Sequence, residues 1–471
     1  MVDFPQAFLD LIESTMPAHL TLDEFVRYSQ LPLRRSIRVN TLKISVEDFN
    51  QRMTKKGWRL TPVPWCQQGF WLDGEQDDIA LGNIPEHLAG LFYIQEASSM
   101  MPPFALFHFL NQPEYVLDVA SAPGSKTSQI AALMDNSGLL IANEYSSSRV
   151  KVLHSNLQRL GVRNVALTHF DGHVFGPTLP EQFDAILLDA PCGGEGTVRK
   201  DPDAMRNWSL QSIDEITQVQ RGLIDSAFCA LKSGGVMVYS TCTLNRQENH
   251  DVCNYLKAQY PDQVEFLSLA DLFPGAEQSC GAEGFLHIWP QIYDSEGFFV
   301  AAIRKTGSVD STYIKPRLGN FPFKPADAEV TAQITNYLEQ QLGITVPADG
   351  VVMARDAELW WFPQNLMPLL DKIRLQRLGV KLADVHKKGF RTHHQAVLAL
   401  PCDQTRCVEL TLEQAEQYLM GRDIPMGEAG GKGETIVCLD GTVLGLAKWI
   451  NSRLKNGLPR DLVKDKISHY A

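Results

Sequence analysis

The chain has 471 residues, of which 43 are Lys or Arg and 55 are Asp or Glu, giving a formal net charge of −12. Hydrophobic residues make up 44% and charged residues 21% of the chain, which excludes disordered and fibrous classes. The longest uncharged run, residues 97–113, contains prolines and polar side chains. A spanning helix needs about 20 mostly apolar residues, so we expect no membrane protein.

The N-terminal residues and the cysteines indicate a cellular compartment. The first 26 residues contain no Lys or Arg, so we expect no secretory signal. Nine cysteines occur without any C-x-x-C pair, which argues against a disulfide framework and favours reduced thiols in the cytoplasm. We expect no metal site.

Four regions differ in pattern. Residues 1–104 mix helical and extended signals, and Thr21-Leu-Asp-Glu24 has the spacing of a helix-capping box. Residues 105–305 alternate short apolar runs with helix-period segments, which is typical of βαβ units and a parallel sheet. Residues 306–385 begin with a linker rich in Gly, Pro and Ser and continue as a small mixed segment. Residues 386–471 form a C-terminal module.

The second region predicts a doubly wound α/β domain. The expected parallel strands, in chain order, are residues 115–120, 138–144, 165–171, 183–189 and 235–242. Helices are expected over 126–134, around 150–160 and over 213–231, and a closing antiparallel pair over 284–290 and 297–305.

Three segments are basic within this acidic chain. Residues 27–43 have a local charge of +5, residues 372–391 of +6 and residues 448–466 of +4. On charge alone the first segment indicates a solvated face. The two later segments concentrate positive charge toward the C-terminus, which favours contacts with nucleic-acid phosphates.

The first loop of the α/β region indicates the cofactor. It reads Ala120-Ser-Ala-Pro-Gly-Ser-Lys126, and such loops bind ligands at the carboxyl ends of strands. It matches neither the glycine pattern of a dinucleotide site nor a P-loop. Glu144 ends the second strand, where a carboxylate can accept both hydroxyls of a ribose. A nucleoside without phosphates, S-adenosylmethionine, therefore fits better than NAD or ATP, while a generic strand-to-helix turn is the alternative from this loop alone.

Two cysteines follow neighbouring strands of the expected sheet. Cys192 comes shortly after the strand that ends at Asp189, and Cys242 ends the next strand. Covalent addition of a thiolate to carbon 6 of a pyrimidine makes carbon 5 nucleophilic. A carboxylate near N3 can share or supply the proton that offsets the developing negative charge, and after methyl transfer a base must remove the carbon 5 proton so that the first thiol can leave. A zinc-dependent deaminase is disfavoured, because the chain has no H-x-E and no P-C-x-x-C motif.

Five sequence blocks between residues 37 and 249 resemble the RNA cytosine-5 methyltransferases. They are Ile37-Arg-Val-Asn40, Tyr93-Ile-Gln-Glu-Ala-Ser-Ser99, Leu117-Asp-Val-Ala-Ser-Ala-Pro-Gly-Ser-Lys-Thr127, Asp189-Ala-Pro-Cys-Gly-Gly-Glu-Gly196, and Ser240-Thr-Cys-Thr243 with Glu248-Asn249. The C-terminal Gly445-Leu-Ala-Lys448 and Leu454-Lys-Asn-Gly-Leu-Pro459 are similar to the PUA-like tail of the bacterial RsmF branch, which modifies 16S ribosomal RNA of the small subunit.

The resemblance implies a fold and four domains. We expect an N-terminal RNA-facing α+β domain over 1–104 and a Rossmann-like S-adenosylmethionine-dependent methyltransferase domain over 105–305. A linker and small mixed (pre-PUA) domain over 306–385 and a PUA-like RNA-binding β module over 386–471 follow.

The resemblance also implies residue roles. Cys242 matches the nucleophile, Cys192 the cysteine that assists release, and Asp189 the carboxylate at N3. Arg38 and Asn40 match an RNA-facing block. The family's cofactor contacts match Ala120, Ser121, Ala122, Pro123, Gly124, Ser125, Lys126, Glu144, Arg149, Asp171 and Asp189. Two positions depart from the usual pattern, since Ser125 and Gly193 stand where the family often has Gly and Ser.

Two other functions are compatible with parts of the pattern. A non-catalytic RNA-binding assembly factor would have no chemical need for both cysteines and Asp189. A methyltransferase acting on cytosine in DNA or in another RNA shares the chemistry, but the basic C-terminal region and the Thr-Cys-Thr sequence favour RNA.

Overall fold

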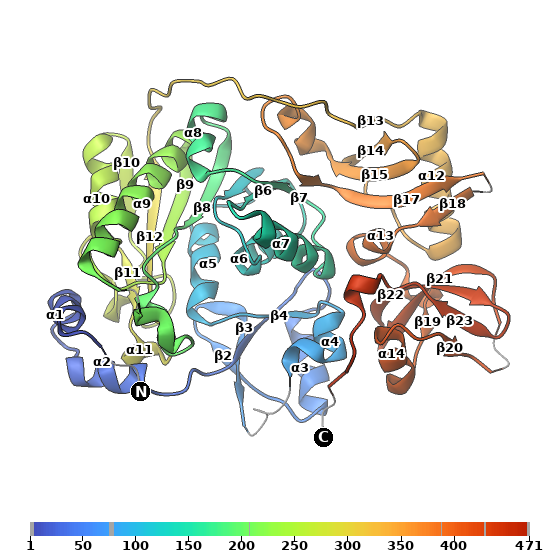
Figure 1. Cartoon of the computed structure of the whole chain (residues 1–471), viewed down its shortest axis with the longest axis horizontal. Helices are drawn as coiled ribbons and strands as arrows, with labels where there is room; N and C mark the ends of the chain where they lie inside the picture. Colours follow the sequence, from blue (N-terminus) through green and yellow to red (C-terminus); the bar gives the residue numbers. More distant parts are fainter. Residues whose placement is uncertain (1–3, 75–79, 207, 388, 428–429, 469–471) are drawn as a thin grey trace.

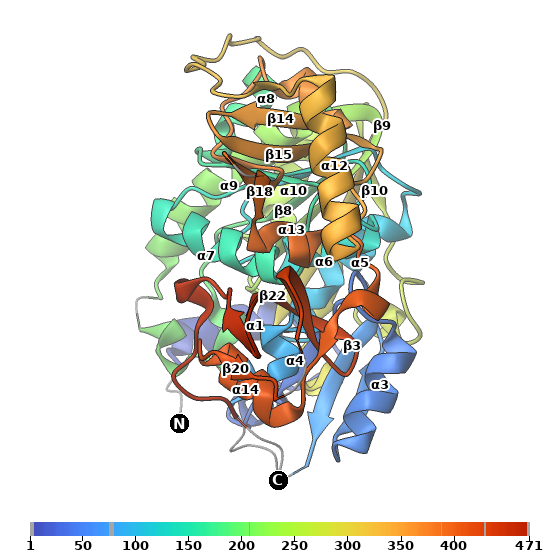
Figure 2. The same cartoon turned by 90° about the vertical axis from the view of Figure 1, so that its right-hand side faces the viewer.

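The computed structural model describes residues 4–74, 80–206, 208–387, 389–427 and 430–468. Figure 1 shows a central α/β domain with the N-terminal elements below it and two smaller sheets on the right. In the same view the chain's C-terminal end returns to lie beside the N-terminal helices α3 and α4. Figure 2 shows helix α12 lying along the sheet that contains β14 and β15.

The N-terminal unit combines four α-helices with an antiparallel sheet of order β2-β3-β1-β4. Its elements are α1 (Gln6–Thr15), α2 (Leu22–Ser29), β1 (Ser36–Val39), α3 (Val46–Lys55), β2 (Arg59–Val63), β3 (Cys66–Asp73), α4 (Pro85–Leu88) and β4 (Phe92–Ile94). The expected helix start at Thr21 is confirmed, because its side chain accepts the backbone N–H of Glu24 at the first turn of α2.

The central sheet has the order β10-β12-β9-β8-β5-β6-β7-β16, with β11 paired to β12. Its strands are β5 (Tyr115–Asp118), β6 (Leu139–Asn143), β7 (Val165–Thr168), β8 (Phe183–Asp189), β9 (Leu231–Thr241), β10 (Val264–Leu267), β11 (Leu286–Ile288), β12 (Phe298–Lys305) and β16 (Arg377–Leu378). Strands β5 to β9 pair in parallel, and β11 and β12 form the expected antiparallel pair. The Rossmann-like prediction is confirmed.

Helices cover both faces of this sheet. They are α5 (Met101–His108), α6 (Ser125–Leu133), α7 (Ser147–Arg159), α8 (Phe175–Thr178), α9 (Leu210–Ala230), α10 (His250–Gln259) and α11 (Pro290–Tyr293). Successive strand residues point to opposite faces, so Val116 packs in the core with Ile130 of α6, whereas Leu117 packs in a second core with Ile224 of α9. This double cover leaves the strand ends as the accessible edge.

The third unit contains a sheet of order β13-β14-β15-β17-β18. Its elements are β13 (Lys324–Pro325), α12 (Ala328–Leu342), β14 (Gly350–Arg355), β15 (Glu358–Pro363), β17 (Val380–His386), β18 (Gly389–Thr392) and α13 (His394–Ala399). The boundary that we expected between residues 385 and 386 falls inside β17, which pairs with β18. The unit therefore continues through α13. Likewise, the boundary expected at 104/105 falls inside α5.

The C-terminal unit is a five-stranded sheet of order β19-β21-β22-β23-β20, with one α-helix. Its elements are β19 (Val408–Glu409), α14 (Leu412–Leu419), β20 (Ile424–Pro425), β21 (Gly433–Leu439), β22 (Thr442–Ile450) and β23 (Arg453–Asn456). The expected C-terminal β module is therefore present.

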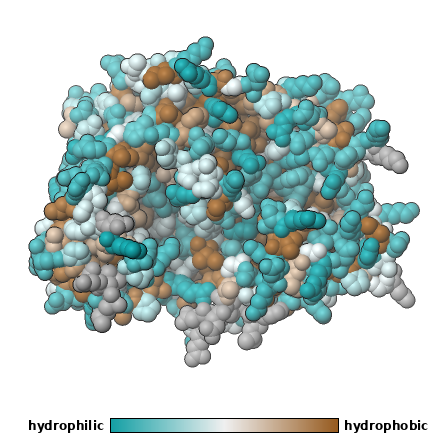
Figure 3. All heavy atoms as spheres, in the orientation of Figure 1, coloured by the Kyte–Doolittle hydropathy of each residue, from teal (hydrophilic) through white to brown (hydrophobic). Residues whose placement is uncertain are grey.

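The surface is mostly hydrophilic. Figure 3 shows polar side chains over most of one face, with apolar side chains scattered among them. Within the described ranges, no helix has the length and apolar character needed to cross a bilayer.

Candidate active site

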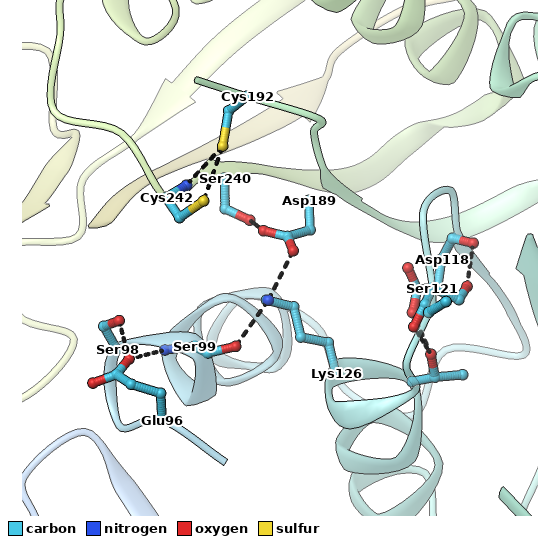
Figure 4. A network of polar contacts seen from close by, with 12 residues as sticks. Glu96, Ser98, Ser99, Asp118, Ser121, Lys126, Asp189, Cys192, Ser240 and Cys242 are labelled. Atoms are coloured by element: carbon cyan, nitrogen blue, oxygen red, sulfur yellow. Dashed lines mark hydrogen bonds and ion pairs between the residues drawn. The ribbon is translucent and has the colours of Figure 1, made fainter. Parts of the chain in front are cut away.

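The candidate site lies at the carboxyl edge of the central sheet. Lys126 lies in the first turn of α6, directly after the loop that follows β5. The loop after β8 carries Cys192, and Cys242 follows β9 directly. Because β5, β8 and β9 are parallel neighbours, their following loops meet at one edge. Figure 4 shows the side chains of these loops converging there.

The two thiols are in direct contact. Cys192 Sγ lies 3.0 Å from Cys242 Sγ, and the backbone N–H of Cys242 donates to Cys192 Sγ over 3.3 Å. The adjacent Cys242 sulfur, followed by burial, raises the pKa of Cys192 well above its ordinary value. Cys192 therefore holds its proton strongly in this arrangement.

Asp189 lies between the thiols and the loop after β5. Ser240 Oγ donates to its Oδ1 over 2.7 Å, and Lys126 Nζ lies 2.7 Å from its Oδ2. Lys126 also donates to Ser99 Oγ over 2.9 Å. Burial disfavours the charged form of Lys126, but the attraction of Asp189 outweighs it and raises the pKa of the lysine. The site thus contains a lysine cation fixed against a carboxylate.

Two buried carboxyl groups that sequence reasoning did not assign hold the Cys192 loop. Glu248 accepts the Gly193 N–H over 2.9 Å, and both Glu248 and Glu195 accept Asn245 Nδ2 over 2.7 Å. A Cβ at Gly193 would lie 2.8 Å from Glu248 Oε1, so a side chain at this position would require Glu248 to move. Glu195 and Glu248 both lie in sequence blocks that resemble the methyltransferase family. Only the tertiary contacts show that they hold the Cys192 loop.

A cavity of ≈ 270 Å³ opens beside Lys126 and Cys242. Its lining includes, from the expected cofactor loop, Ala120, Ser121, Ala122, Pro123, Ser125 and Lys126, together with Asp189 and Cys242. Gly124 adopts φ +105° at the start of α6, and a Cβ there would lie 3.0 Å from Leu153 Cδ1. This backbone requires glycine. The cavity brings loop backbone, a lysine and carboxylates to one place, which suits the mixed charges of S-adenosylmethionine.

Three expected cofactor residues surround the loop without lining this cavity. Glu144 follows β6 and accepts the N–H groups of Ala122 over 3.3 Å and Ser146 over 2.8 Å. Arg149 Nη1 lies 3.6 Å from Glu144 and donates through Nη2 to Ala122 O over 2.6 Å. Asp171 follows β7 and caps the next turn, accepting the His173 N–H over 3.1 Å. Glu144 and Arg149 therefore contact the cofactor loop directly.

Arg38 and Asn40 are buried. Both are only 1% exposed. Arg38 donates to Gln95 Oε1 over 2.8 Å and to Ser128 Oγ over 2.7 Å, and Asn40 Nδ2 donates to the carbonyls of Gly90 and Leu160. These bonds join the N-terminal unit to α6 and α7. Both side chains therefore bond within the protein in this structure, and a contact of either one with RNA stays a prediction.

No group of three or more His, Cys, Asp or Glu side chains suited to a metal ion occurs among the described residues. The nine cysteines are all free.

The whole chain matches known family models and relatives. It is 56% identical to ribosomal RNA small subunit methyltransferase F of Shewanella piezotolerans, over 100% of this chain and 99% of the relative. The chain belongs to the ribosomal RNA small subunit methyltransferase F family. A second member, from Aliivibrio fischeri, is 58% identical over 98% of both chains.

Family models agree along the methyltransferase F chain. Residues 4–97 match the N-terminal domain of 16S rRNA methyltransferase RsmF, and residues 107–304 match 16S rRNA methyltransferase RsmB/F. Residues 323–400 match the pre-PUA domain, and residues 405–464 match the PUA domain. The domain over 107–304 is a Rossmann-like S-adenosylmethionine-dependent methyltransferase domain.

Solved structures share part of the methyltransferase F fold. A methyltransferase homologue from Pyrococcus horikoshii is 35% identical, with a TM-score of 0.53 over 64% of this chain and all of that one. NSun6 from the same organism, solved with SFG, has a TM-score of 0.56 at 22% identity, over 64% of this chain and 99% of that one. The second likeness concerns the fold alone.

Proposed function

We propose that this protein methylates carbon 5 of a cytosine in 16S ribosomal RNA. The observation that carries the proposal is the contact between two thiols beside Asp189, at the mouth of the cofactor cavity. The 3.0 Å between Cys192 Sγ and Cys242 Sγ allows both sulfurs to reach one flipped base.

The first step uses Cys242. Its thiolate forms a bond to C6 of the cytosine, and the electron pair of the C5–C6 double bond becomes available at C5. Negative charge develops toward N3 and O2 of the ring. Asp189 lies near that edge, and the adjacent Lys126 cation, 2.7 Å from Asp189, stabilises the developing charge. When bound, S-adenosylmethionine supplies the methyl group that C5 takes up.

The last step restores the aromatic ring. In this step we propose that Cys192, in its thiolate form, takes up the C5 proton. The C–H electron pair re-forms the C5–C6 double bond, and the C6–S bond breaks with its electrons returning to Cys242 as a thiolate. We assign Cys192 to this release, since it is the neighbouring group in contact with the Cys242 sulfur.

The proposed substrate follows from the relatives. Their name specifies ribosomal RNA of the small subunit, and the C-terminal β module matches a PUA domain. We therefore propose 16S ribosomal RNA, or the small subunit, as the partner in the cytoplasm.

A labelling experiment tests the proposed function. The protein is incubated with methyl-labelled S-adenosylmethionine and RNA or DNA from cells that lack it, and the modified position is mapped. We expect label in 16S RNA, recovered as 5-methylcytosine. Label in DNA would favour the DNA methyltransferase alternative. No label in any nucleic acid, with cofactor binding intact, would favour the assembly-factor alternative.

A further inference from the structure

Two carboxyl groups on the wall of the cavity have no role in the steps above. Glu96 follows β4 in the N-terminal unit, and Glu296 precedes β12 in the central domain. The backbone N–H of Glu296 donates to Glu96 Oε1 over 3.2 Å, and Glu96 Oε2 accepts the Ser99 N–H over 3.2 Å. The pair therefore joins two units at the edge of the active site.

Glu296 is incompletely bonded. Its side chain belongs to a residue only 5% exposed, and its Oε1 has no hydrogen-bond partner among the residues that the structure describes. Burial and the charge of Glu96 raise the pKa of Glu296 to about 8. A buried carboxyl oxygen without a partner is costly, and an oxygen in a ligand cavity gains a partner when a ligand brings a donor.

Glu96 lies on the opposite side of Lys126 from Asp118 (Figure 4). In Figure 4, Lys126 stands between Asp118 on one side and Ser99 and Glu96 on the other. Glu296 is tied to the nucleophile's strand, because the neighbouring Gly297 N–H donates to Gly196 O and the Gly196 N–H donates to Cys242 O, each over 2.9 Å. A molecule that meets Cys242 and this pair is the target nucleotide.

The chemistry of an RNA nucleotide limits what such a pair can bind. Carboxylates repel phosphates, and the N3 and O2 atoms of cytosine are acceptors. A cytidine inside an RNA chain has only two kinds of donor, the exocyclic amine and the ribose 2′-hydroxyl.

We propose that the Glu96–Glu296 pair is an acceptor site for the target cytidine, receiving a hydrogen bond from its exocyclic amine or its 2′-hydroxyl. The inference rests on the proposed function and deepens it. An amine contact would discriminate against uridine, and a hydroxyl contact would discriminate against DNA.

The test compares Glu296→Gln with wild type on three substrates. Each is a 16S RNA fragment carrying, at the mapped position, cytidine, 2′-deoxycytidine or a pyrimidin-2-one ribonucleotide, which lacks the amine. The rate of covalent adduct formation is measured at subsaturating RNA. A matched control is Glu265→Gln, which removes an exposed carboxylate paired with Arg304 on the same sheet.

We expect Glu296→Gln to lower the rate of adduct formation on the cytidine fragment by 10-fold or more. Its affinity for S-adenosylmethionine should be unchanged. On the fragment that lacks the contacted donor, Glu296→Gln and wild type should react at the same rate. This fragment therefore identifies whether the amine or the 2′-hydroxyl donates to the pair. An equal loss on all three fragments, no loss on any, or weakened cofactor binding would overturn the inference. Should Glu296→Gln fail to fold, Glu296→Asp is measured in the same way, with the same expected dependence on the donor.

The two proposals fail in different ways. If wild-type protein does not methylate the cytidine fragment, the proposed function is wrong. If wild type is active and Glu296→Gln shows no dependence on either donor, only the acceptor site is wrong.

Discussion

Lys126 Nζ lies 2.7 Å from Asp189 Oδ2, and this ion pair connects the first turn of α6 to the end of β8, just before the loop that carries Cys192. Both side chains are largely shielded from water, with exposed fractions of 12% and 27%. The same lysine donates to Ser99 of the N-terminal unit. The Lys126 cation therefore joins the segments around Lys126, Asp189 and Ser99, and the proposed reaction requires these segments to keep their relative positions.

Replacing Lys126 with Met should abolish this connection. We expect methyl transfer to fall at least 100-fold, and the free energy of unfolding to fall by about 2–3 kcal/mol, because Asp189 is left without its cation. Lys232→Met is the matched control, since Lys232 Nζ lies 2.6 Å from Asp184, which is on β8 like Asp189. It should cost less than about 1 kcal/mol and leave activity intact. Urea unfolding measures the stability of both variants, and transfer of the labelled methyl group measures their activity. Similar activity in both variants would contradict the prediction.

The two thiols should separate in a trapping experiment. Cys192→Ala can add Cys242 to the base and accept the methyl group, but it resolves slowly, so a covalent protein–RNA species should accumulate on a denaturing gel. Cys242→Ala cannot begin the reaction and should give neither product nor adduct. An adduct from Cys242→Ala with none from Cys192→Ala would reverse the two roles and leave the methyltransferase assignment standing.

Glu144→Ala should weaken the binding of S-adenosylmethionine. The carboxylate supports Ala122 and Ser146 through their N–H groups, and we expect it to hold the ribose. Loss of such charge-assisted bonds corresponds to about 1.5–3 kcal/mol, or roughly 10- to 100-fold in affinity by calorimetric titration. Wild-type affinity in a folded variant would move the ribose site to another group.

The buried carboxyl of Glu195 should make stability depend on pH. Burial raises its pKa from 4.5 to about 7, so the folded state holds a proton that the unfolded state loses. Its cost to folding is absent below about pH 4.5 and complete above about pH 7. Relative to wild type, Glu195→Gln should therefore gain on the order of 2 kcal/mol in unfolding free energy between pH 4.5 and pH 8. Parallel pH profiles for the two proteins in urea unfolding would refute this.

A pair of lysines in the C-terminal module should contact RNA phosphates. Lys448 and Lys455 are exposed and lie directly opposite each other on β22 and β23, where like charges repel. Replacing both with Ala should lower the slope of log affinity against log salt by roughly 1.5–2, with unchanged or slightly higher stability. The control replaces Lys55 and Lys324, which are exposed on other elements. Equal slopes for both double variants would place the phosphate contacts elsewhere.

Several features could be predicted from the sequence because they depend on local pattern. Short apolar runs separated by helix-period segments predicted the parallel sheet, and Thr21 predicted the start of α2. Asp189, Cys192 and Cys242 were candidates because each follows a strand, and parallel strands end at one edge.

The basic segment over 27–43 required the tertiary structure. Its charge indicated a solvated face, yet Arg38 is buried and Lys43 Nζ donates to the carbonyls of Ala89 and Arg159. Lys388, in the second basic segment, lies outside the described residues. A side chain's charge does not reveal its partners, because those partners come from distant parts of the chain.

The acceptor pair and the unit boundaries also required the tertiary structure. Glu96 and Glu296 are 200 residues apart in sequence, and β16 leaves the third unit to pair with β7 of the central sheet. Local periodicity by itself determined the strands, the helices and the loops that carry the thiols. Long-range hydrogen bonds and burial decided which of the remaining charged side chains reach the site, because they depend on how the separate units pack together.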